Sequence, residues 1–346
     1  THGKTTTTAM TALALLGAGR DPAALIGGQV RELGGNYRPG TGPLVYELDE
    51  SDRLFPLLHP QVAVLTNLEA DHIAGGPVDR PNYYHTLEEL FATCCRFVQE
   101  LPPEGLLVYC ADWPALDSIV QHAPGRTLSY GLTARARLQA QQRRSSLPQR
   151  AQVVLDGQEL GIIELPVPGE HNLSNALGAL AAASALGAEF APAAQALASF
   201  RGAGRRLEKI GEAKGIAVYD DYAHHPTAVR VTLEAAREWR RPIKLVFQPH
   251  RYLRTKELYL EFAQAVAAAD GVILLDIYAA GEAPIAGVSA RLILEALPLG
   301  TRAFYAGTIE AAVAYLARTV QDHDLVLTMG AGDVSLVGQR LLEVLK

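Results

Sequence analysis

The first eight residues constrain the fold of this chain more than any other segment. Gly3-Lys4-Thr5 supplies the last three positions of the phosphate-binding pattern G-x-x-x-x-G-K-[ST], and an apolar run over residues 9–16 follows directly. A glycine turn that leads into a helix leaves backbone N–H groups at the helix N-terminus, where the helix dipole also favours an anion. A run of four threonines at the start of a helix is unusual, because Thr is a poor helix former. A structural helix start would need only one N-cap residue.

This pattern predicts a phosphate-binding loop formed by Thr1, His2, Gly3, Lys4, Thr5 and Thr6. Lys4 can reach the β- and γ-phosphates of a nucleotide, and the Thr5 hydroxyl can ligate Mg²⁺. The alternative is that a Gly-Lys-Thr tripeptide occurs here by chance. The opening glycine of the pattern would precede Thr1, so we expect this chain to be part of a longer one.

Composition excludes several classes of protein. The chain has 346 residues, enough for about two domains, with 49% hydrophobic and 20% charged residues. A net charge of −6 without a basic run argues against a nucleic-acid binder, and the short apolar stretches predict no membrane insertion. Cys94, Cys95 and Cys110 form neither a disulfide framework nor a zinc site, so we expect a cytoplasmic protein in which Cys94 and Cys95 pack in a helix.

The first part of the chain is predicted to combine short buried strands with helices. Apolar runs indicate strands over 44–48, 61–66 and 106–110, and helices are expected over 87–100, 172–186 and 191–200. Thr86 is a candidate N-cap for the helix that starts at residue 87. Alternating segments on either side of Asp156-Gly157 predict a hairpin, and therefore a small antiparallel sheet appended to the first domain.

The stretch 201–206 is the best linker candidate, because it holds two glycines among charged residues. It divides the chain into domains 1–201 and 202–346. In the second domain, strands predicted at 216–220, 244–248, 271–276, 302–305 and 325–329 alternate with helical segments. This alternation is typical of a mainly parallel, doubly wound α/β sheet, whose ligands bind beyond the carboxyl ends of the strands.

Acidic residues and a histidine follow two of the predicted strands in the first domain. The segment 47–52 reads Glu-Leu-Asp-Glu-Ser-Asp, and the segment 66–72 reads Thr-Asn-Leu-Glu-Ala-Asp-His. If the sheet is parallel, both segments lie on the same rim as the phosphate loop. Mg²⁺ prefers oxygen ligands, so a carboxylate beside the phosphates is expected. Solvated loop acids are the simpler alternative.

The order of these motifs resembles the Mur ligase family. The segments that carry the resemblance are THGKTTTTAM, DESD, TNLEADH, PGEHNLSNAL, GAGRRLE, DDYAHHPT, FQPHRYLRT and AGEAPIAGV, between residue 1 and about residue 340. The resemblance implies an ATP-dependent, amide-bond-forming ligase of peptidoglycan synthesis with three domains. The first domain would hold a UDP-sugar, the second would hold ATP, and the third would close over the site. The sequence matches the second, a P-loop-type central ATP-binding domain, and the third, a Rossmann-like α/β domain.

The resemblance also implies roles for single residues. Lys4 would contact the transferring phosphate and Thr5 one Mg²⁺, while Glu47 and His72 would hold a second Mg²⁺ near the substrate carboxylate. Glu50 is a further candidate, three residues after Glu47. The remaining ATP contacts implied by the resemblance are Asn172, Asn175, Arg206 and Asp221. Helix capping is the alternative role for Asn172.

Three further residues are expected to contact substrate. His224, in His224-His225-Pro226-Thr227, is expected to hydrogen-bond substrate or phosphate, and Pro226 fits a first helical turn. No third ligand is spaced to make the two histidines a zinc site. Arg251 and Arg254 are candidate clamps for a carboxylate or phosphate, since guanidinium groups bind these anions in a bidentate manner. A solvated basic rim is the alternative.

The implied reaction joins L-alanine to UDP-N-acetylmuramate through an acyl phosphate, with Lys4, Glu47, His72 and His224 as catalytic residues and ATP and Mg²⁺ as cofactors. Closure about a Gly202–Gly204 hinge would keep the acyl phosphate from water. No Lys lies between Val62 and Phe97 to supply the carbamylated lysine that some relatives use. The alternatives are a recycling ligase that adds a tripeptide to the same sugar nucleotide, a P-loop ATPase without ligase activity, and a non-catalytic interaction protein.

Overall fold

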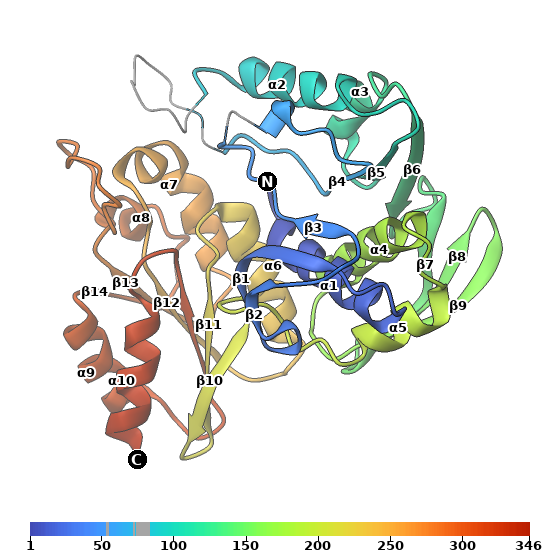
Figure 1. The fold of residues 1–346 in the computed structure, drawn as a ribbon. Coiled ribbons are helices and arrows are strands. Elements are labelled where there is room, and N and C mark those ends of the chain that lie inside the picture. Colours follow the sequence, from blue (N-terminus) through green and yellow to red (C-terminus); the bar gives the residue numbers. More distant parts are fainter. Residues whose placement is uncertain (53–54, 72, 74–83) are drawn as a thin grey trace. The chain divides into compact units, whose positions relative to one another are not determined.

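The chain folds into two units, Thr1–Ala203 and Gly204–Lys346, and each is built on its own β-sheets (Figure 1). The computed structural model describes residues 1–52, 55–71, 73 and 84–346. The division falls inside the predicted linker, two residues after the predicted boundary at residue 201.

The described residues of the first unit form two sheets. β1 (Ala23–Val30) pairs with β2 (Gly35–Arg38) antiparallel and with β3 (Leu44–Tyr46) parallel, in the order β2-β1-β3. The second sheet has the order β4-β5-β6-β7-β8-β9. Its strands are β4 (Val62–Leu65), β5 (Leu106–Cys110), β6 (Arg126–Gly131), β7 (Leu138–Arg144), β8 (Gln149–Leu155) and β9 (Gln158–Leu165).

The predicted hairpin is present, but the sheet assignment around it was wrong. Asp156 and Gly157 connect β8 to β9 with φ angles of 49° and 84°, as a tight two-residue turn requires. The antiparallel strands do not form a separate small sheet. β7 pairs parallel with β6 through Tyr130 and Leu138, so the hairpin extends the parallel sheet and covers one of its edges.

Five α-helices of the first unit come from the segments that the structure describes. They are α1 (Lys4–Gly17), α2 (Leu87–Gln99), α3 (Asp117–Val120), α4 (Glu170–Ala185) and α5 (Phe190–Leu197). The predicted N-cap of α2 is confirmed, because the Thr86 side chain accepts a hydrogen bond from the Glu89 backbone N–H at 3.2 Å. Cys94 is buried in α2, and burial raises the pKa of its thiol to about 12, which makes it a packing residue.

The second unit is doubly wound, as predicted. Its sheet has the order β10-β11-β15-β12-β13-β14, in which only the edge strand β10 (Glu208–Ala213) is antiparallel to its neighbour. The other strands are β11 (Ile216–Asp221), β12 (Ile243–Phe247), β13 (Gly271–Leu275), β14 (Ala303–Gly307) and β15 (Leu325–Met329). Because β11 to β15 are parallel, their carboxyl ends share one edge of the sheet.

Helices cover both faces of this sheet (Figure 1). α9 (Ile309–Thr319) and α10 (Ser335–Leu345) pack on one face, through residues such as Leu316 and Leu341. α6 (Pro226–Arg237), α7 (Tyr252–Val266) and α8 (Arg291–Glu295) pack on the other, through residues such as Leu233 and Phe262. Pro226 opens α6 as predicted.

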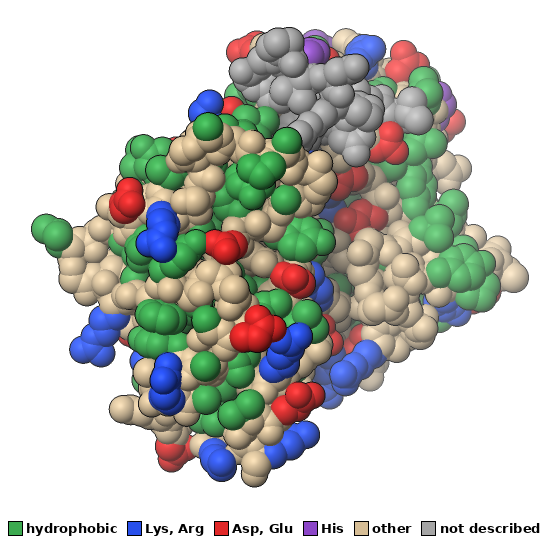
Figure 2. Space-filling model, turned by 90° about the vertical axis from the view of Figure 1, so that its left-hand side faces the viewer, with side chains coloured by type: hydrophobic (Ala, Val, Ile, Leu, Met, Phe, Trp, Pro, Cys, Tyr) green, Lys and Arg blue, Asp and Glu red, His purple; other side chains and the backbone are tan. Residues whose placement is uncertain are grey.

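Five strands of the described residues were missed from sequence, namely β1, β2, β6, β7 and β10. β1 contains Gly27-Gly28 at its centre, which weakens the strand pattern, and β2 and β10 carry charged or polar residues at a sheet edge. Among the described residues, no helix combines the length and the apolar character needed to cross a membrane. Figure 2 shows acidic and basic side chains interspersed on the face that it presents.

Candidate functional site

The N-terminus of α1 offers the backbone groups of an anion site. Its N-cap, Gly3, has a left-handed φ of 78°, no side chain caps the helix, and the first turn contains no acidic residue. The first N–H groups of a helix lack intrahelical partners, so they remain available to a phosphate. A Cβ atom at Gly3 would lie 2.4 Å from the Asn175 Oδ1 atom, so this close approach requires glycine.

Lys4 is held by carboxylates at the mouth of this loop. Its Nζ atom donates to Glu50 Oε2 at 2.5 Å and to the Thr1 carbonyl at 3.1 Å, and Asp49 Oδ2 lies 3.5 Å away. Burial lowers the pKa of Lys4, but the carboxylates of Glu50 and Asp49 outweigh it and raise the pKa above the usual value. Lys4 is therefore a cation, as phosphate binding requires.

Glu50 is the buried partner of this lysine. Burial alone would raise the pKa of Glu50, but the ammonium groups of Thr1 and Lys4 lower it to about 2. Its second oxygen, Oε1, is buried and has no hydrogen-bond partner among the described residues. From the sequence, Glu50 was only a further candidate, since its contact with Lys4 depends on how the loop after β3 folds.

Glu47 lies beside the phosphate loop, where a Mg²⁺ ligand was expected. Its Oε1 atom accepts a hydrogen bond from the Thr5 hydroxyl at 2.8 Å, and its Oε2 atom accepts one from the Gly27 N–H at 2.7 Å. A Cβ at Gly27 would come within 2.6 Å of the same carboxylate. Gly27 thus positions Glu47, a role that sequence reasoning missed although two adjacent glycines in an apolar strand were a visible signal.

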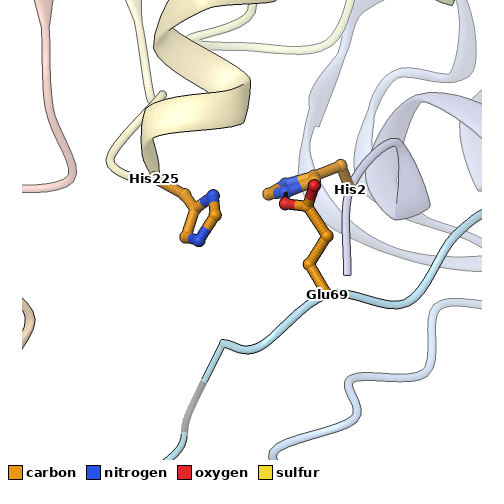
Figure 3. Close-up of side chains that lie close together, drawn as sticks. All are labelled: His2, Glu69 and His225. Carbon is orange, nitrogen blue, oxygen red and sulfur yellow. Dashed lines mark hydrogen bonds and ion pairs between the residues drawn. The ribbon is translucent and has the colours of Figure 1, made fainter. Parts of the chain in front are cut away.

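The segment after β4 binds the first residues of the chain. The His2 N–H donates to Asn67 Oδ1 at 2.7 Å, and the Thr66 hydroxyl donates to the His2 carbonyl at 2.7 Å. Figure 3 shows the side chains of His2 and Glu69 together, and the His2 Nε2 atom lies 2.7 Å from Glu69 Oε2. His72, the expected Mg²⁺ ligand from this segment, lies outside the described residues.

The two asparagines of α4 have different surroundings. Asn175 is buried, and its Oδ1 atom accepts a hydrogen bond from the Thr7 hydroxyl at 3.3 Å, so α4 contacts the start of α1. The Asn172 amide donates to the Pro168 carbonyl at 2.7 Å. The capping alternative for Asn172 was wrong, because the N-cap of α4 is Gly169 and no side chain accepts from the first turn.

In the second unit, Arg206 and Asp221 lie near the end of β11. Asp221 is buried, and its two oxygens accept hydrogen bonds from the backbone N–H groups of Leu207 and Ala223, each at 2.8 Å. Burial raises the pKa of Asp221, and the charge of Arg206 opposes that rise. The Arg206 guanidinium carbon lies 5.3 Å from the centre of the Tyr222 ring.

The structural role of Arg205 was not predicted from the sequence. Its Nε atom donates to Asp220 Oδ2 at 2.8 Å, and its terminal nitrogens donate to the carbonyls of Gly330 and Gly332 at 2.7 and 3.1 Å. One guanidinium group therefore connects the segment before β10 to the loop after β15. Its φ of 57° is unusual for a residue other than glycine.

Histidine and arginine side chains meet at the carboxyl ends of β11 and β12. The ring centres of His224 and His250 lie 5.5 Å apart, and the Arg254 Nη1 atom lies 3.3 Å from the His250 Nδ1 atom. The His250 ring stacks on Tyr278, which follows β13, with centres 5.7 Å apart. Arg251 is the N-cap of α7, and its N–H donates to the Tyr278 carbonyl at 2.8 Å.

Neighbouring polar residues hold these strand-end loops in place. The Gln248 amide donates to Asp333 Oδ1 at 2.8 Å, and the Leu253 N–H donates to Glu282 Oε2 at 3.1 Å. Glu282 is only 6% exposed. Glu282 lies in the segment AGEAPIAGV, one of those that carry the family resemblance, but no role was predicted for Glu282 or for Asp333.

Both units match known families of domains. The Mur ligase middle domain matches residues 1–183, and the Mur ligase glutamate ligase domain matches residues 205–332.

Two curated relatives of this chain have the same enzyme name. The UDP-N-acetylmuramate–L-alanine ligase of Deinococcus radiodurans is 44% identical over 348 residues, which are 99% of this chain and 70% of the relative. The enzyme of the same name from Desulforamulus reducens is 44% identical over 353 residues, which are 100% of this chain and 74% of the relative. The relatives are therefore longer than this chain.

Solved structures share the fold. The UDP-N-acetylmuramate-alanine ligase of Thermotoga maritima superposes with a TM-score of 0.80 at 30% identity, over 99% of this chain and 73% of that chain. A murein peptide ligase from Psychrobacter arcticus superposes with a TM-score of 0.72 at 24% identity, over 100% of this chain and 76% of that chain. This second similarity shows a shared fold.

Proposed function

Because this chain belongs to the Mur ligase family, we propose that it is an ATP-dependent ligase that joins L-alanine to UDP-N-acetylmuramate in peptidoglycan synthesis. The relatives with 44% identity carry the name of that activity. Three free cysteines in the described residues agree with the reducing compartment, the cytoplasm, in which such an enzyme would work.

One observation carries the proposal: the Thr5 hydroxyl and the Glu47 carboxylate meet at 2.8 Å beside the uncapped start of α1. Thr5 comes from the helix and Glu47 from the segment after β3, so only the folded sheet brings them together. A helix N-terminus with a lysine, a hydroxyl and a carboxylate is suited to a nucleotide triphosphate and its metal ion.

We assign ATP contacts in both units on the same grounds. The backbone of the loop 1–6, namely Thr1, His2, Gly3, Lys4, Thr5 and Thr6, would hold the phosphates. The position of Asn175 beside Gly3 and Thr7 supports an ATP contact for this residue, and the family resemblance supports one for Asn172. Arg206 has the geometry for a phosphate. Each Asp221 oxygen accepts one backbone hydrogen bond, which leaves lone pairs for ribose hydroxyls.

The residues around Thr5 fit a Mg²⁺ ion. Among the described residues the candidate ligand atoms here are oxygens, which Mg²⁺ prefers: the Thr5 hydroxyl, the Glu47 carboxylate and the Oε1 atom of Glu50. We propose that Thr5 would hold one Mg²⁺ and that Glu47, together with His72, would hold a second. When bound, the ions would neutralise charge on the phosphate oxygens and on the substrate carboxylate.

The reaction needs a carboxylate to attack a phosphate, although both are anions. In the proposed first step, a carboxylate oxygen of UDP-N-acetylmuramate bonds to the γ-phosphorus and the bond to ADP breaks. Lys4 and the start of α1 reduce the repulsion between the two anions. In the second step, the amine of L-alanine bonds to the acyl carbon, inorganic phosphate leaves, and the nitrogen loses a proton.

We propose that the histidine and arginine side chains at the carboxyl ends of β11 and β12 bind the acid and amine substrates. Arg251 and Arg254 would clamp a carboxylate, and His224 would hydrogen-bond substrate or phosphate. The contact between Arg254 and His250 supports this assignment, because it fixes the guanidinium at the carboxyl ends of the parallel strands.

A coupled assay tests the proposal on this chain and on a longer form that adds the part of a curated relative which this chain does not cover. ADP release is measured with MgATP, UDP-N-acetylmuramate and either L-alanine or the tripeptide of the recycling reaction. The expected result is ADP release by the longer form that needs both UDP-N-acetylmuramate and L-alanine. Lys4→Met should abolish that release while the circular dichroism spectrum is retained.

Three outcomes would contradict the proposal. ADP release that depends on the tripeptide and not on L-alanine would identify the recycling ligase. ADP release that needs no amine would identify an ATPase. Absence of MgATP binding by calorimetry, in a chain with a native spectrum, would identify a non-catalytic protein.

A further inference from the structure

A buried carboxylate that the proposed reaction does not use contacts the helix that carries the substrate-binding arginines. Glu282 is buried and lies in the loop after β13. Its Oε2 atom accepts a hydrogen bond from the Leu253 N–H at 3.1 Å. Leu253 is the second residue of α7, and Arg254 is the third. Glu282 therefore binds the turn of the helix from which the Arg254 side chain extends.

The start of α7 has no cap of its own. Its N-cap is Arg251, which has a φ of 73° and whose side chain offers no acceptor to the first turn. The first N–H groups of a helix need partners from outside the helix. A carboxylate suits this position, because it accepts hydrogen bonds and because negative charge is favourable at a helix N-terminus. Glu282 thus supplies the cap that Arg251 cannot.

The turn before Glu282 has an unusual backbone. The Glu282 N–H donates to the Ala279 carbonyl at 2.9 Å, and the two residues between them, Ala280 and Gly281, have φ angles of 49° and 80°. Positive φ at both central positions is typical of a type I′ turn and is unfavourable for alanine. Such a backbone persists only where the surrounding contacts fix it. The hydrogen bond from Leu253 is one of these contacts.

Other contacts join the same loop to the start of α7. The Arg251 N–H donates to the Tyr278 carbonyl at 2.8 Å, and the His250 ring stacks on the Tyr278 ring with an angle of 9° between their planes. A substitution of Glu282 leaves the backbone hydrogen bond and the ring contact in place. It removes only the side-chain acceptor next to Arg254. The loss of Glu282 should therefore loosen Arg254 without unfolding the second unit.

We infer that Glu282 is a positioning residue, which acts through Arg254 and thereby sets the affinity for the amino acid that supplies the amine. This inference rests on the proposed function, in which Arg254 clamps a carboxylate. In this role Glu282 does not contact substrate. Its carboxylate holds the first turn of α7, and that turn holds the guanidinium in place for the carboxylate of the amino acid.

Three variants separate this role from a general loss of stability. Glu282→Ala removes the acceptor, whereas Glu282→Gln keeps an oxygen that can accept from Leu253. Thr308→Ala is the matched control, because the Thr308 side chain caps α9 in the same unit by accepting from the Ala311 N–H at 3.2 Å. This control removes a helix cap that has no contact with the arginines in the proposed role.

Steady-state kinetics in the ADP-release assay, with the longer form, give the first readout. Glu282→Ala should raise the KM for L-alanine about tenfold, while kcat and the KM for MgATP change less than about threefold. Glu282→Gln should restore the KM for L-alanine to within about threefold of the parent, and Thr308→Ala should leave it there. An unchanged KM for L-alanine in an active Glu282→Ala enzyme would overturn the inference.

A double variant tests whether the effect passes through Arg254. In the Arg254→Lys background, Glu282→Ala should raise the KM for L-alanine by less than about twofold, because the group that Glu282 positions is already replaced. If the two effects multiply instead, Glu282 acts elsewhere and the inference is wrong.

An NMR measurement on this chain does not depend on ligase activity. The Arg254 Nε–H signal, assigned by its loss in Arg254→Lys, should exchange with water at least about tenfold faster in Glu282→Ala than in the parent or in Thr308→Ala. An unchanged rate in a folded Glu282→Ala protein would overturn the inference. If the parent releases no ADP with L-alanine, the proposed function fails, and the exchange rate still decides whether Glu282 positions Arg254.

Discussion

The pairing of Lys4 with Glu50 predicts a measurable loss of stability in Glu50→Gln. The pKa of Glu50 falls from 4.5 to about 2, because the charges of Thr1 and Lys4 outweigh the burial that raises it. A tenfold change in proton affinity is worth about 1.4 kcal/mol, so the charged carboxylate contributes roughly 3 kcal/mol at pH 7. The variant should be less stable than the parent by about that amount.

The pH dependence has a definite sign. A carboxyl whose pKa is lowered by folding stabilises the protein above its unfolded pKa of 4.5 and loses that effect as the pH falls towards about 2. The difference in free energy of unfolding between parent and variant should therefore be constant near pH 7. It should decrease below about pH 4.5 and vanish near pH 2.

The assay is urea unfolding followed by tryptophan fluorescence. The chain has two tryptophans, and Trp239→Phe leaves Trp113 as the reporter of the first unit. Glu104→Gln is the matched control, because Glu104 is exposed and its replacement should cost less than about 0.5 kcal/mol. A Glu50→Gln loss no larger than that of the control, or a loss that persists at pH 2, would refute the reasoning.

Three other predictions follow from the geometry. Gly3→Ala should weaken MgATP binding at least about tenfold by calorimetry, because φ is 78° and the new Cβ would lie 2.4 Å from Asn175 Oδ1; unchanged affinity would contradict this. Arg205→Lys should destabilise the second unit by about 2 kcal/mol in urea unfolding reported by Trp239, because the fork to Asp220 and two carbonyls is lost; a cost near zero would refute it. Arg254→Lys should raise the KM for L-alanine about tenfold in the ADP-release assay with kcat less affected, and an unchanged KM would remove Arg254 from the substrate site.

The sequence alone determined the local elements that short-range chemistry specifies. A Gly-Lys-Thr turn before an apolar run predicted the start of α1, and Thr86 predicted that of α2. Asp156-Gly157 predicted the β8–β9 turn because both residues tolerate positive φ. The strands β5 and β15 have the predicted bounds, since buried parallel strands are continuous apolar runs between polar residues.

Only the tertiary structure decided which of these elements meet. Glu47 reaches Thr5 because β3 runs parallel to β1 and because Gly27 has no side chain, and neither fact is encoded near residue 47. Glu50 is the buried partner of Lys4 and not a solvated loop acid. Arg205 connects two loops that lie more than a hundred residues apart in the sequence. Hydrogen bonds and charge pairs of this kind act over a few ångströms in space, so their partners depend on the fold and not on spacing along the chain.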